Sequence, residues 1–419
     1  MTDSHIMDNE YVENARWSAI TAVKQAPDAK FLLFTGDFVE TGTEQNSEWE
    51  WEQWFEVSMK PLLSRMALAP TDGNHDDTPN LNYTYHFNTD KTFNETATVK
   101  PQFDGITYSF VYGDALFMVY SHQDFWRGSY SYANGTSTYL SNDVANWFRD
   151  QVEKYPDTKW RIAAVHKNLF TGSGHQTDED GALFRATLLP VFQELNIDFV
   201  IQGHDHIYEV MGPINNTTKT IVPGSVTNVE LVSPDSNKNP KGQQGGTFNV
   251  KDGTLYFVNG TCGRKRYYPY TQDEMEAGFD KHKVEGYWDL FTGKYGQPGA
   301  PAFSEISVSS SEIEVNTYTS DANAQATLFD TFKIVKSGNT GIEENKQSAK
   351  LYPTYAKDKI NTTESDIIQV NAIDLTGKIY TLPFDNQHID VSNLTDGIYV
   401  VQIFTNEKTR SERIVKTSR

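Results

Sequence analysis

The sequence predicts a layered α/β domain with a largely parallel sheet, followed by a small all-β module. Strand-like and helix-like segments alternate over the first half of the chain, which is typical of strands that pair in parallel. After about residue 250 the pattern becomes mostly strand. From Leu351 onward short strands alternate only with turns, which indicates a separate module without helices.

The strands of the α/β part are short apolar runs, and its helices are amphipathic segments. The first run, Lys30–Thr35, is almost continuously apolar, as expected for a buried strand of a parallel sheet. The predicted helices span 11–26, 47–65, 141–154 and 182–195. The predicted strands span 30–35, 66–70, 106–112, 115–121, 160–165, 198–201, 254–259, 303–308, 312–318 and 328–335. Four aromatic residues of the second helix are expected to lie in the core rather than to bind sugar: Trp49, Trp51, Trp54 and Phe55.

A polar stretch at 336–350 contains no aromatic residue and is expected to be a linker. It separates a predicted domain at 1–335 from a predicted module at 351–419. The predicted strands of the module span 367–373, 378–382, 389–391, 398–404 and 413–415. Residues 339–419 carry 11 acidic and 10 basic residues, so almost all of the net charge of −20 belongs to the first domain.

Composition excludes several classes of protein. A net charge of −20 makes the chain a poor general binder of nucleic acid, and no binding of nucleic acid is expected except as a possible substrate. The single cysteine, Cys262, cannot form an internal disulfide or a four-cysteine zinc site. No run of about 18 apolar residues occurs, so no transmembrane helix is predicted. The 24 Phe, 22 Tyr and 8 Trp supply material for a core and argue against disorder.

The segment Met1–His5 is not a signal peptide, because it has no basic start and no apolar stretch. It places Asp3 and His5 almost at the beginning of the chain, with no strand before them to hold them. We therefore expect that upstream residues, including a strand, precede Met1 in the full-length protein. A short native terminus with an unimportant Asp3 and His5 is the alternative.

Polar motifs follow the ends of the predicted strands, where open α/β sheets place their ligands. The motifs are Asp3-Ser4-His5, Gly36-Asp37, Gly73-Asn74-His75-Asp76, His166 and Gly203-His204-Asp205-His206. Each alone has a plain alternative, such as a turn, a capping asparagine or a core histidine. Together they hold too many carboxylate, imidazole and amide donors for one tetrahedral zinc, and they suit two metals that share a bridging carboxylate. The glycines allow the ligand loops to approach the metals closely.

In this order the five motifs resemble the calcineurin-like metallophosphoesterase superfamily, over about residues 1–335, and within it the purple acid phosphatases. The resemblance implies a four-layer α/β/β/α sandwich, here with its N-terminal strand truncated. It also implies two metal ions, with Fe, Zn and Mn all compatible. Metal one would be held by Asp3, His5, Asp37 and His206. Metal two would be held by Asp37, Asn74, His166 and His204, so that Asp37 bridges.

The resemblance further implies hydrolysis of a small phosphorylated substrate, a phosphate monoester, by a hydroxide bound to the two metals. His75 would stabilise charge or protonate the leaving group, and His175 would be a further histidine beside the substrate, unless it is a solvated loop residue. Purple enzymes carry a tyrosine where this chain has Glu40, so an iron–tyrosinate centre is not expected. The alternatives are a phosphodiesterase or nucleotide hydrolase, and a surface binding protein on a decayed scaffold. The basic run 264–266 is expected to be a set of exposed charges, and the alternative is that it binds a second phosphate or a substrate carboxylate.

The last segment is similar to the C-terminal sorting domain of the type IX (Por) secretion system of Bacteroidota. Four stretches carry this likeness: Leu351-Tyr352-Pro353, Ile373–Lys378, Ile389–Val401 and Arg413–Lys416. The resemblance implies that the type IX machinery recognises residues 351–419. The protein would then be exported across the outer membrane of a Gram-negative bacterium, and released or held at the cell surface. An immunoglobulin-like accessory module is the alternative.

Overall fold

The computed structural model divides the chain into two compact units, Met1–Ser337 and Gly338–Arg419. Most of the predicted linker, together with Leu351-Tyr352-Pro353, lies outside the described residues. The structure describes residues 1–42, 47–76, 82–88, 106–122, 138–216, 229–231, 245–278, 284, 286–336, 355–362, 366–374, 376–385, 388–405 and 409–418.

The largest sheet of the N-terminal unit has a parallel centre and antiparallel margins. In spatial order its strands are β11 (Tyr295–Gly296), β7 (Tyr208–Asn216), β10 (Thr254–Asn259), β6 (Phe199–Gln202), β5 (Trp160–Ala164), β4 (Ala115–Val119) and β3 (Tyr108–Tyr112), with β8 (Val229–Leu231) paired to β7. The four neighbours β10, β6, β5 and β4 are parallel. The parallel order of these central strands confirms the α/β class, and it brings the loops after β5 and β6 to one edge.

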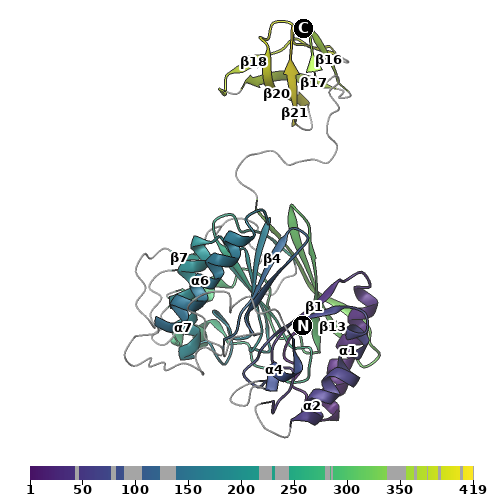
Figure 1. Cartoon of the computed structure of the whole chain (residues 1–419), viewed down its shortest axis with the longest axis vertical. Helices are drawn as coiled ribbons and strands as arrows, with labels where there is room; N and C mark the ends of the chain where they lie inside the picture. Colours follow the sequence, from purple (N-terminus) through teal and green to yellow (C-terminus); the bar gives the residue numbers. More distant parts are fainter. Residues whose placement is uncertain are drawn as a thin grey trace. The chain divides into compact units, whose positions relative to one another are not determined.

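A second sheet contains the strands predicted near the end of the domain. Its order is β12 (Ala302–Val308), β13 (Glu312–Ser320), β14 (Ala326–Val335) and β9 (Thr247–Asn249). A separate parallel pair consists of β1 (Phe31–Thr35) and β2 (Ala67–Thr71). Figure 1 shows α6 (Thr138–Lys154) and α7 (Glu179–Glu194) on one side of the unit, and α1 (Asn9–Gln25) and α2 (Glu48–Gln53) on the other, with the sheets between them.

Apolar clusters of the described residues fill the spaces between these layers, and three of them are large. Trp147 and Phe148 of α6 pack with Met118 of β4 on the outer face of the large sheet. The two sheets bury a second cluster against each other: Phe117, Ile162, Phe199, Phe257, Ile313 and Phe332. A third cluster joins α1 and α2 to β1: Ala15, Ala19, Phe34, Trp51 and Trp54. The layers therefore follow the predicted order of helix, sheet, sheet and helix.

The predicted helix at 47–65 forms three shorter elements. The helix α2 is followed by η1 (Trp54–Ser58), which is a π-helical turn, and then by α3 (Lys60–Leu63). Pro61 lies at the start of α3 and has no amide hydrogen to continue the preceding hydrogen bonds, so a new helix begins there. Trp51 and Trp54 are buried as predicted, but the prediction is wrong for Trp49, which is 43% exposed.

Several elements were not predicted. The strand β7 contains Gly212-Pro213. This pair is typical of turns, so the sequence pattern did not indicate a long strand there. The helix α8 (Gln272–Ala277) begins with a capping box formed by Thr271 and Glu274. Two further short helical elements are α4 (Asn82–His86) and η5 (Tyr287–Leu290). These short segments carry too few residues to show a clear period of hydrophobicity.

The C-terminal unit consists of strands in its described residues, as predicted. Its five-stranded sheet has the order β15 (Tyr355–Ala356), β21 (Thr409–Lys416), β20 (Gly397–Thr405), β17 (Ile367–Asp374) and β18 (Ile379–Thr381). A second pair is formed by β16 (Lys359–Asn361) and β19 (His388–Asp390). Its own apolar core includes Ile360, Val370, Ile389, Val401 and Ile414. In neither unit does the described part of the chain include a helix long and apolar enough to cross a membrane.

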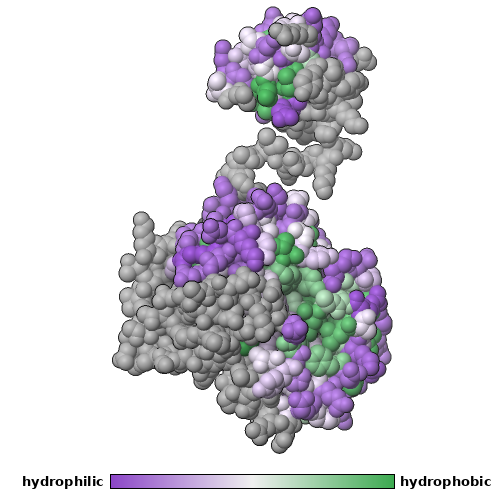
Figure 2. Space-filling view, viewed as in Figure 1, coloured by the Kyte–Doolittle hydropathy of each residue, from purple (hydrophilic) through white to green (hydrophobic). Residues whose placement is uncertain are grey.

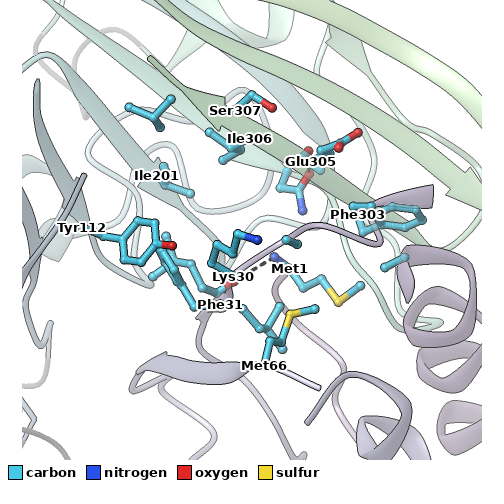
Figure 3. A pocket seen from close by; sticks show the side chains of 18 of the residues that line it. Met1, Lys30, Phe31, Met66, Tyr112, Ile201, Phe303, Glu305, Ile306 and Ser307 are labelled. Carbon is cyan, nitrogen blue, oxygen red and sulfur yellow. Dashed lines mark hydrogen bonds between the residues drawn. The ribbon is translucent and has the colours of Figure 1, made fainter. Parts of the chain in front are cut away.

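An apolar cavity of about 450 Å³ lies between β1 and β12. Figure 2 shows hydrophobic surface gathered where Figure 1 labels β1, β4 and β13. Figure 3 shows Phe31, Phe303 and Ile306 around this cavity, with Met1 at its border, and the Met1 amino group donates to the Leu33 carbonyl at 3.0 Å. No predicted metal ligand is among its lining residues, so the cavity is separate from the candidate site.

Candidate metal centre

The ligand-bearing loops converge because they follow parallel strands. Asp37 lies two residues after β1, Asn74 three after β2, His166 two after β5, and His204 two after β6. The amino-terminal segment joins this edge as an extended chain, in which the amide of Asp3 donates to Gly36 (3.0 Å). In the same way the amide of His5 donates to the Asp37 carbonyl (3.1 Å). The structure thus brings together all seven predicted ligands.

Four of these residues form the group that we call site one: Asp3, His5, Asp37 and His206. His5 Nε2 lies 3.2 Å from Asp37 Oδ2. His206 Nε2 lies 3.2 Å from Asp3 Oδ1. The two Nε2 atoms are 3.1 Å apart. All four side chains are buried, so their donor atoms face one another rather than solvent.

A second group, site two, consists of Asp37, Asn74, His166 and His204. His166 Nε2 lies 3.1 Å from Asp37 Oδ2 and 3.2 Å from Asn74 Oδ1. Potential ligand atoms of Asp37, His166 and His204 all lie within 4.8 Å of one another. Asp37 is therefore common to both groups, which is the arrangement that a bridging carboxylate requires.

The outer nitrogens of three histidines have partners that fix the orientation of each ring. His166 Nδ1–H donates to the Thr35 carbonyl (2.7 Å), and His206 Nδ1–H to the Lys265 carbonyl (3.0 Å). His5 Nδ1 pairs with Glu40 Oε2 (2.5 Å). With the hydrogen on Nδ1 and no second proton on the ring, each Nε2 would turn a lone pair toward the carboxylates and toward the other imidazoles. Such a cluster of lone pairs fits bound cations, and this outer hydrogen bonding is typical of metal-ligating histidines.

The electrostatics of the site agree with this donor set. Burial lowers the pKa of His204 well below its ordinary value, and the neighbouring His175 adds to this effect. Burial likewise lowers the pKa of His206. Burial opposes charge on His166 as well, but Asp37 outweighs it and raises the pKa of His166 to about 9. In the metal-free protein a proton therefore shares site two, and metal binding has to release it.

The backbone at four of the seven predicted ligands lies in the left-handed region. The φ angles are 56° at Asp3, 46° at His5, 53° at Asp37 and 69° at His204. Non-glycine residues rarely adopt such values, and they cost of order 1–3 kcal/mol each where the surrounding structure enforces them. Strain concentrated at these residues indicates that the fold holds the donors in place for a function.

The glycines of the motifs lie where one ligand loop passes close to another. A Cβ atom at Gly73 would lie 2.1 Å from both the amide nitrogen and Oδ1 of Asp37. A Cβ at Gly36, whose φ is 88°, would lie 2.5 Å from His166 Nδ1. A Cβ at Gly203 would lie 2.2 Å from Thr2 Oγ1. Each glycine therefore permits one ligand loop to pass against another.

Asp76 has a structural role that the sequence did not reveal. Its buried carboxylate accepts four backbone hydrogen bonds, from Asp37 (2.8 Å), Phe38 (2.8 Å), Val39 (3.3 Å) and Gly73 (2.7 Å). It thereby ties the loop after β1 to the loop after β2. The Gly-Asn-His-Asp motif contained this residue, but its contacts across the sheet edge could not be read from spacing.

The two predicted catalytic histidines lie at the edge of the centre, next to different ligands. The ring of His75 is 4.7 Å from that of His5, and its Nδ1 lies 2.7 Å from the Glu40 carbonyl. The ring of His175 is 3.9 Å from that of His204. Each side chain is 28% exposed, so both remain accessible to a substrate. Burial lowers the pKa of His175, but pairing with Asp205 outweighs this and raises the pKa.

The basic run 264–266 is divided between surface and site. Arg264 pairs with Glu10 on the surface (2.7 Å), which agrees with the reading of exposed charges. Lys265 lies beside the centre, with Nζ 3.6 Å from Glu40 Oε1. Tyr267, which the sequence did not single out, stacks on the ring of His206 at 4.3 Å. Glu40, at the position of the missing tyrosine, contacts the ligand His5 through its carboxylate.

Comparisons with known proteins agree with this geometry. Residues 1–208 match the family of calcineurin-like phosphoesterases, and residues 350–417 match the secretion system C-terminal sorting domain. An uncharacterised protein of Mycobacterium tuberculosis strain H37Rv is 25% identical over 206 residues, which cover 46% of this chain and 37% of that protein. Purple acid phosphatase 5 of Arabidopsis thaliana is 31% identical over 87 residues, which cover 20% of this chain and 22% of that protein.

A solved structure, the purple acid phosphatase from seeds of yellow lupin (Lupinus luteus), is 15% identical to the chain. The match covers 80% of this chain and 52% of that chain, with a TM-score of 0.49. The chain spans less than two thirds of the length of each of these three proteins. By the family match, residues 1–208 belong to a calcineurin-like phosphoesterase domain, which lies within the N-terminal unit. The C-terminal unit is a secretion system sorting domain.

Proposed function

We propose that this protein is a secreted, metal-dependent phosphoesterase that hydrolyses phosphate monoesters. The observation that carries the proposal is the convergence of seven donor residues into two groups that share Asp37. Family membership of the N-terminal unit supports the same reaction class. All seven donor positions are filled, which argues against a decayed scaffold that only binds.

The donor residues would hold two metal ions, one in each site, with Asp37 between them. Two metals so held would lower the pKa of a coordinated water and stabilise negative charge on phosphoryl oxygens. Nitrogen and oxygen donors of this kind are compatible with Fe, Zn or Mn. The carbonyls of Thr35 and Lys265 and the carboxylate of Glu40 keep the imidazoles turned inward.

His75 and His175 would act on the substrate rather than on the metals. The Glu40 carbonyl accepts a hydrogen bond from His75 Nδ1, which leaves Nε2 for a phosphoryl oxygen or the leaving group. An imidazole there can stabilise developing charge or protonate the leaving oxygen, which are the usual roles of histidine in general acid–base catalysis. His175, beside His204, would contact the substrate from the side of site two.

A substrate panel tests this proposal. The metal-loaded protein is expected to contain two transition-metal ions per chain and to hydrolyse aryl phosphate monoesters faster than aryl diesters or nucleotides. Metal content by elemental analysis and initial rates on the three substrate types provide the measurement. Faster turnover of diesters, or of nucleotides at a phosphoanhydride bond, would replace the monoester assignment. No turnover of any of the three by metal-loaded protein would overturn the enzyme proposal.

Export is the second part of the proposal, and it rests on the C-terminal sorting domain. In a bacterium that has a type IX system, the chain with an added signal peptide is expected at the cell surface or in the medium. A chain that ends at Ser337 is expected to remain in the periplasm, because it lacks the sorting unit. Fractionation and immunoblotting measure both. Equal export of the two chains would contradict a sorting role.

A further inference from the structure

A chain of hydrogen-bonding groups leads from the interior of the domain to His175. His175 Nδ1 lies 2.5 Å from Asp205 Oδ1. The other oxygen of Asp205 contacts the Thr171 hydroxyl, which also lies 2.9 Å from Glu209 Oε1. The amide of Gly172 donates to Glu209 Oε2 at 2.7 Å. These groups come from the loop after β5, the loop between β6 and β7, and the start of β7.

The number of hydrogens available to these groups determines which group donates in each hydrogen bond. The Thr171 hydroxyl has a single hydrogen and can donate it to one of the two carboxyl groups. Burial, together with the nearby Asp205, raises the pKa of Glu209 well above its ordinary value, which favours a proton on this carboxyl. With that proton in place, the Thr171 hydroxyl accepts from Glu209 and donates to Asp205. The remaining oxygen of Asp205 accepts from His175 Nδ1–H.

Neighbouring rings restrict His175 further. The ring of His204 lies 3.9 Å away at 33°, and the ring of Tyr267 lies 5.5 Å away at 49°. Asp205 is fully buried, whereas the His175 side chain is 28% exposed. The buried carboxylate of Asp205 thus holds Nδ1 of the partly exposed His175 ring, and Nε2 of that ring remains for a ligand.

We propose that Asp205 is a positioning residue that fixes the ring of His175, so that Nε2 faces a phosphate group bound at site two. This role rests on the proposed function, in which His175 contacts the substrate. Asp205 does not touch the reacting atoms, and it acts through the hydrogen bond to Nδ1. The residue between His204 and His206 would then link metal ligation to substrate contact, because its neighbours on both sides are predicted ligands.

The test uses the full chain loaded with metal and an aryl phosphate. Asp205→Ala and His175→Ala are each expected to lower kcat/KM by about 10²-fold, the scale of one positioned acid–base group. The double variant is expected to lose no more than His175→Ala alone, because Asp205 acts through that ring. Asp205→Asn keeps a neutral acceptor and should fall between wild type and Asp205→Ala. All four are expected to keep two metal ions.

Asp330→Ala is the matched control, because Asp330 is also a buried carboxylate that accepts a hydroxyl hydrogen bond, from Tyr208 at 2.8 Å. It lies in β14 of the second sheet and contacts neither His175 nor Asp205 in any hydrogen bond of the described residues, so kcat/KM should not change. Additive losses in the double variant, or loss of metal from Asp205→Ala, would overturn the positioning role. A wild-type rate retained by Asp205→Ala would do the same.

A measurement that does not depend on catalysis separates the positioning role of Asp205 from the proposed function. In 15N spectra of the metal-loaded wild type, His175 is expected to carry its hydrogen on Nδ1. The resonance should shift in Asp205→Ala, because the acceptor is gone. Inactive protein with this signature would overturn the phosphatase proposal but retain the positioning role. Active protein in which His175 carries no hydrogen on Nδ1 would overturn the positioning role alone.

Discussion

Asp37→Ala is expected to remove both bound metal ions and to lower kcat/KM on an aryl phosphate by at least about 10³-fold. Asp37 Oδ2 lies 3.2 Å from His5 Nε2 and 3.1 Å from His166 Nε2, so one carboxylate serves both groups of donors. Its loss also leaves two buried imidazoles without their shared anion. Elemental analysis and initial rates on the purified variant measure the two effects together.

His204→Ala is compared with Asp37→Ala, because His204 belongs to site two alone whereas Asp37 belongs to both sites. It is expected to leave one metal ion in place and still to abolish most of the activity, since hydrolysis would use both metals. Asp198→Asn is the matched control: it is a buried aspartate at the amino end of β6, the strand whose carboxyl end precedes His204. Retention of two metals and a normal rate by Asp37→Ala would contradict the bridging role.

The sequence placed the candidate donor residues near one another because each motif is local and follows a strand end. Asp37, Asn74, His166 and His204 all follow strands that the apolar runs located within a residue or two. Parallel strands place their carboxyl ends along one edge, so the convergence followed from the pattern alone.

The groups around the ligands could not be predicted in this way. Tyr267 stacks on His206 across 61 positions of sequence, and Glu209 reaches Asp205 through a hydroxyl from another loop. Such contacts depend on how side chains pack after the strands have assembled, and one sequence carries no local signal of them. The interruption of the predicted helix at 47–65 is a different case, because Pro61 is a local signal for a new helix start that the helical pattern concealed.

Asp76→Ala is expected to destabilise the metal-free protein by on the order of 4 kcal/mol. The carboxylate is fully buried and accepts four backbone N–H groups from two loops. A buried donor without a partner costs about 1–3 kcal/mol, and water entering the space left by the side chain recovers part of the total. Urea unfolding of metal-free protein isolates this structural effect from metal binding.

Asp8→Ala is the control that distinguishes burial from hydrogen bonding alone. Asp8 caps α1 and accepts from the amides of Glu10 (2.8 Å) and Tyr11 (3.1 Å), but it is exposed to solvent. Water can replace its contacts, so the expected cost is about 1 kcal/mol. If Asp76→Ala lowers the free energy of unfolding no more than Asp8→Ala does, the two ligand loops hold their positions without the Asp76 carboxylate. If Asp76→Ala is the more destabilised of the two variants, it should also bind metal more weakly than the wild type. Asp37 and Asn74 lie on the loops that Asp76 joins.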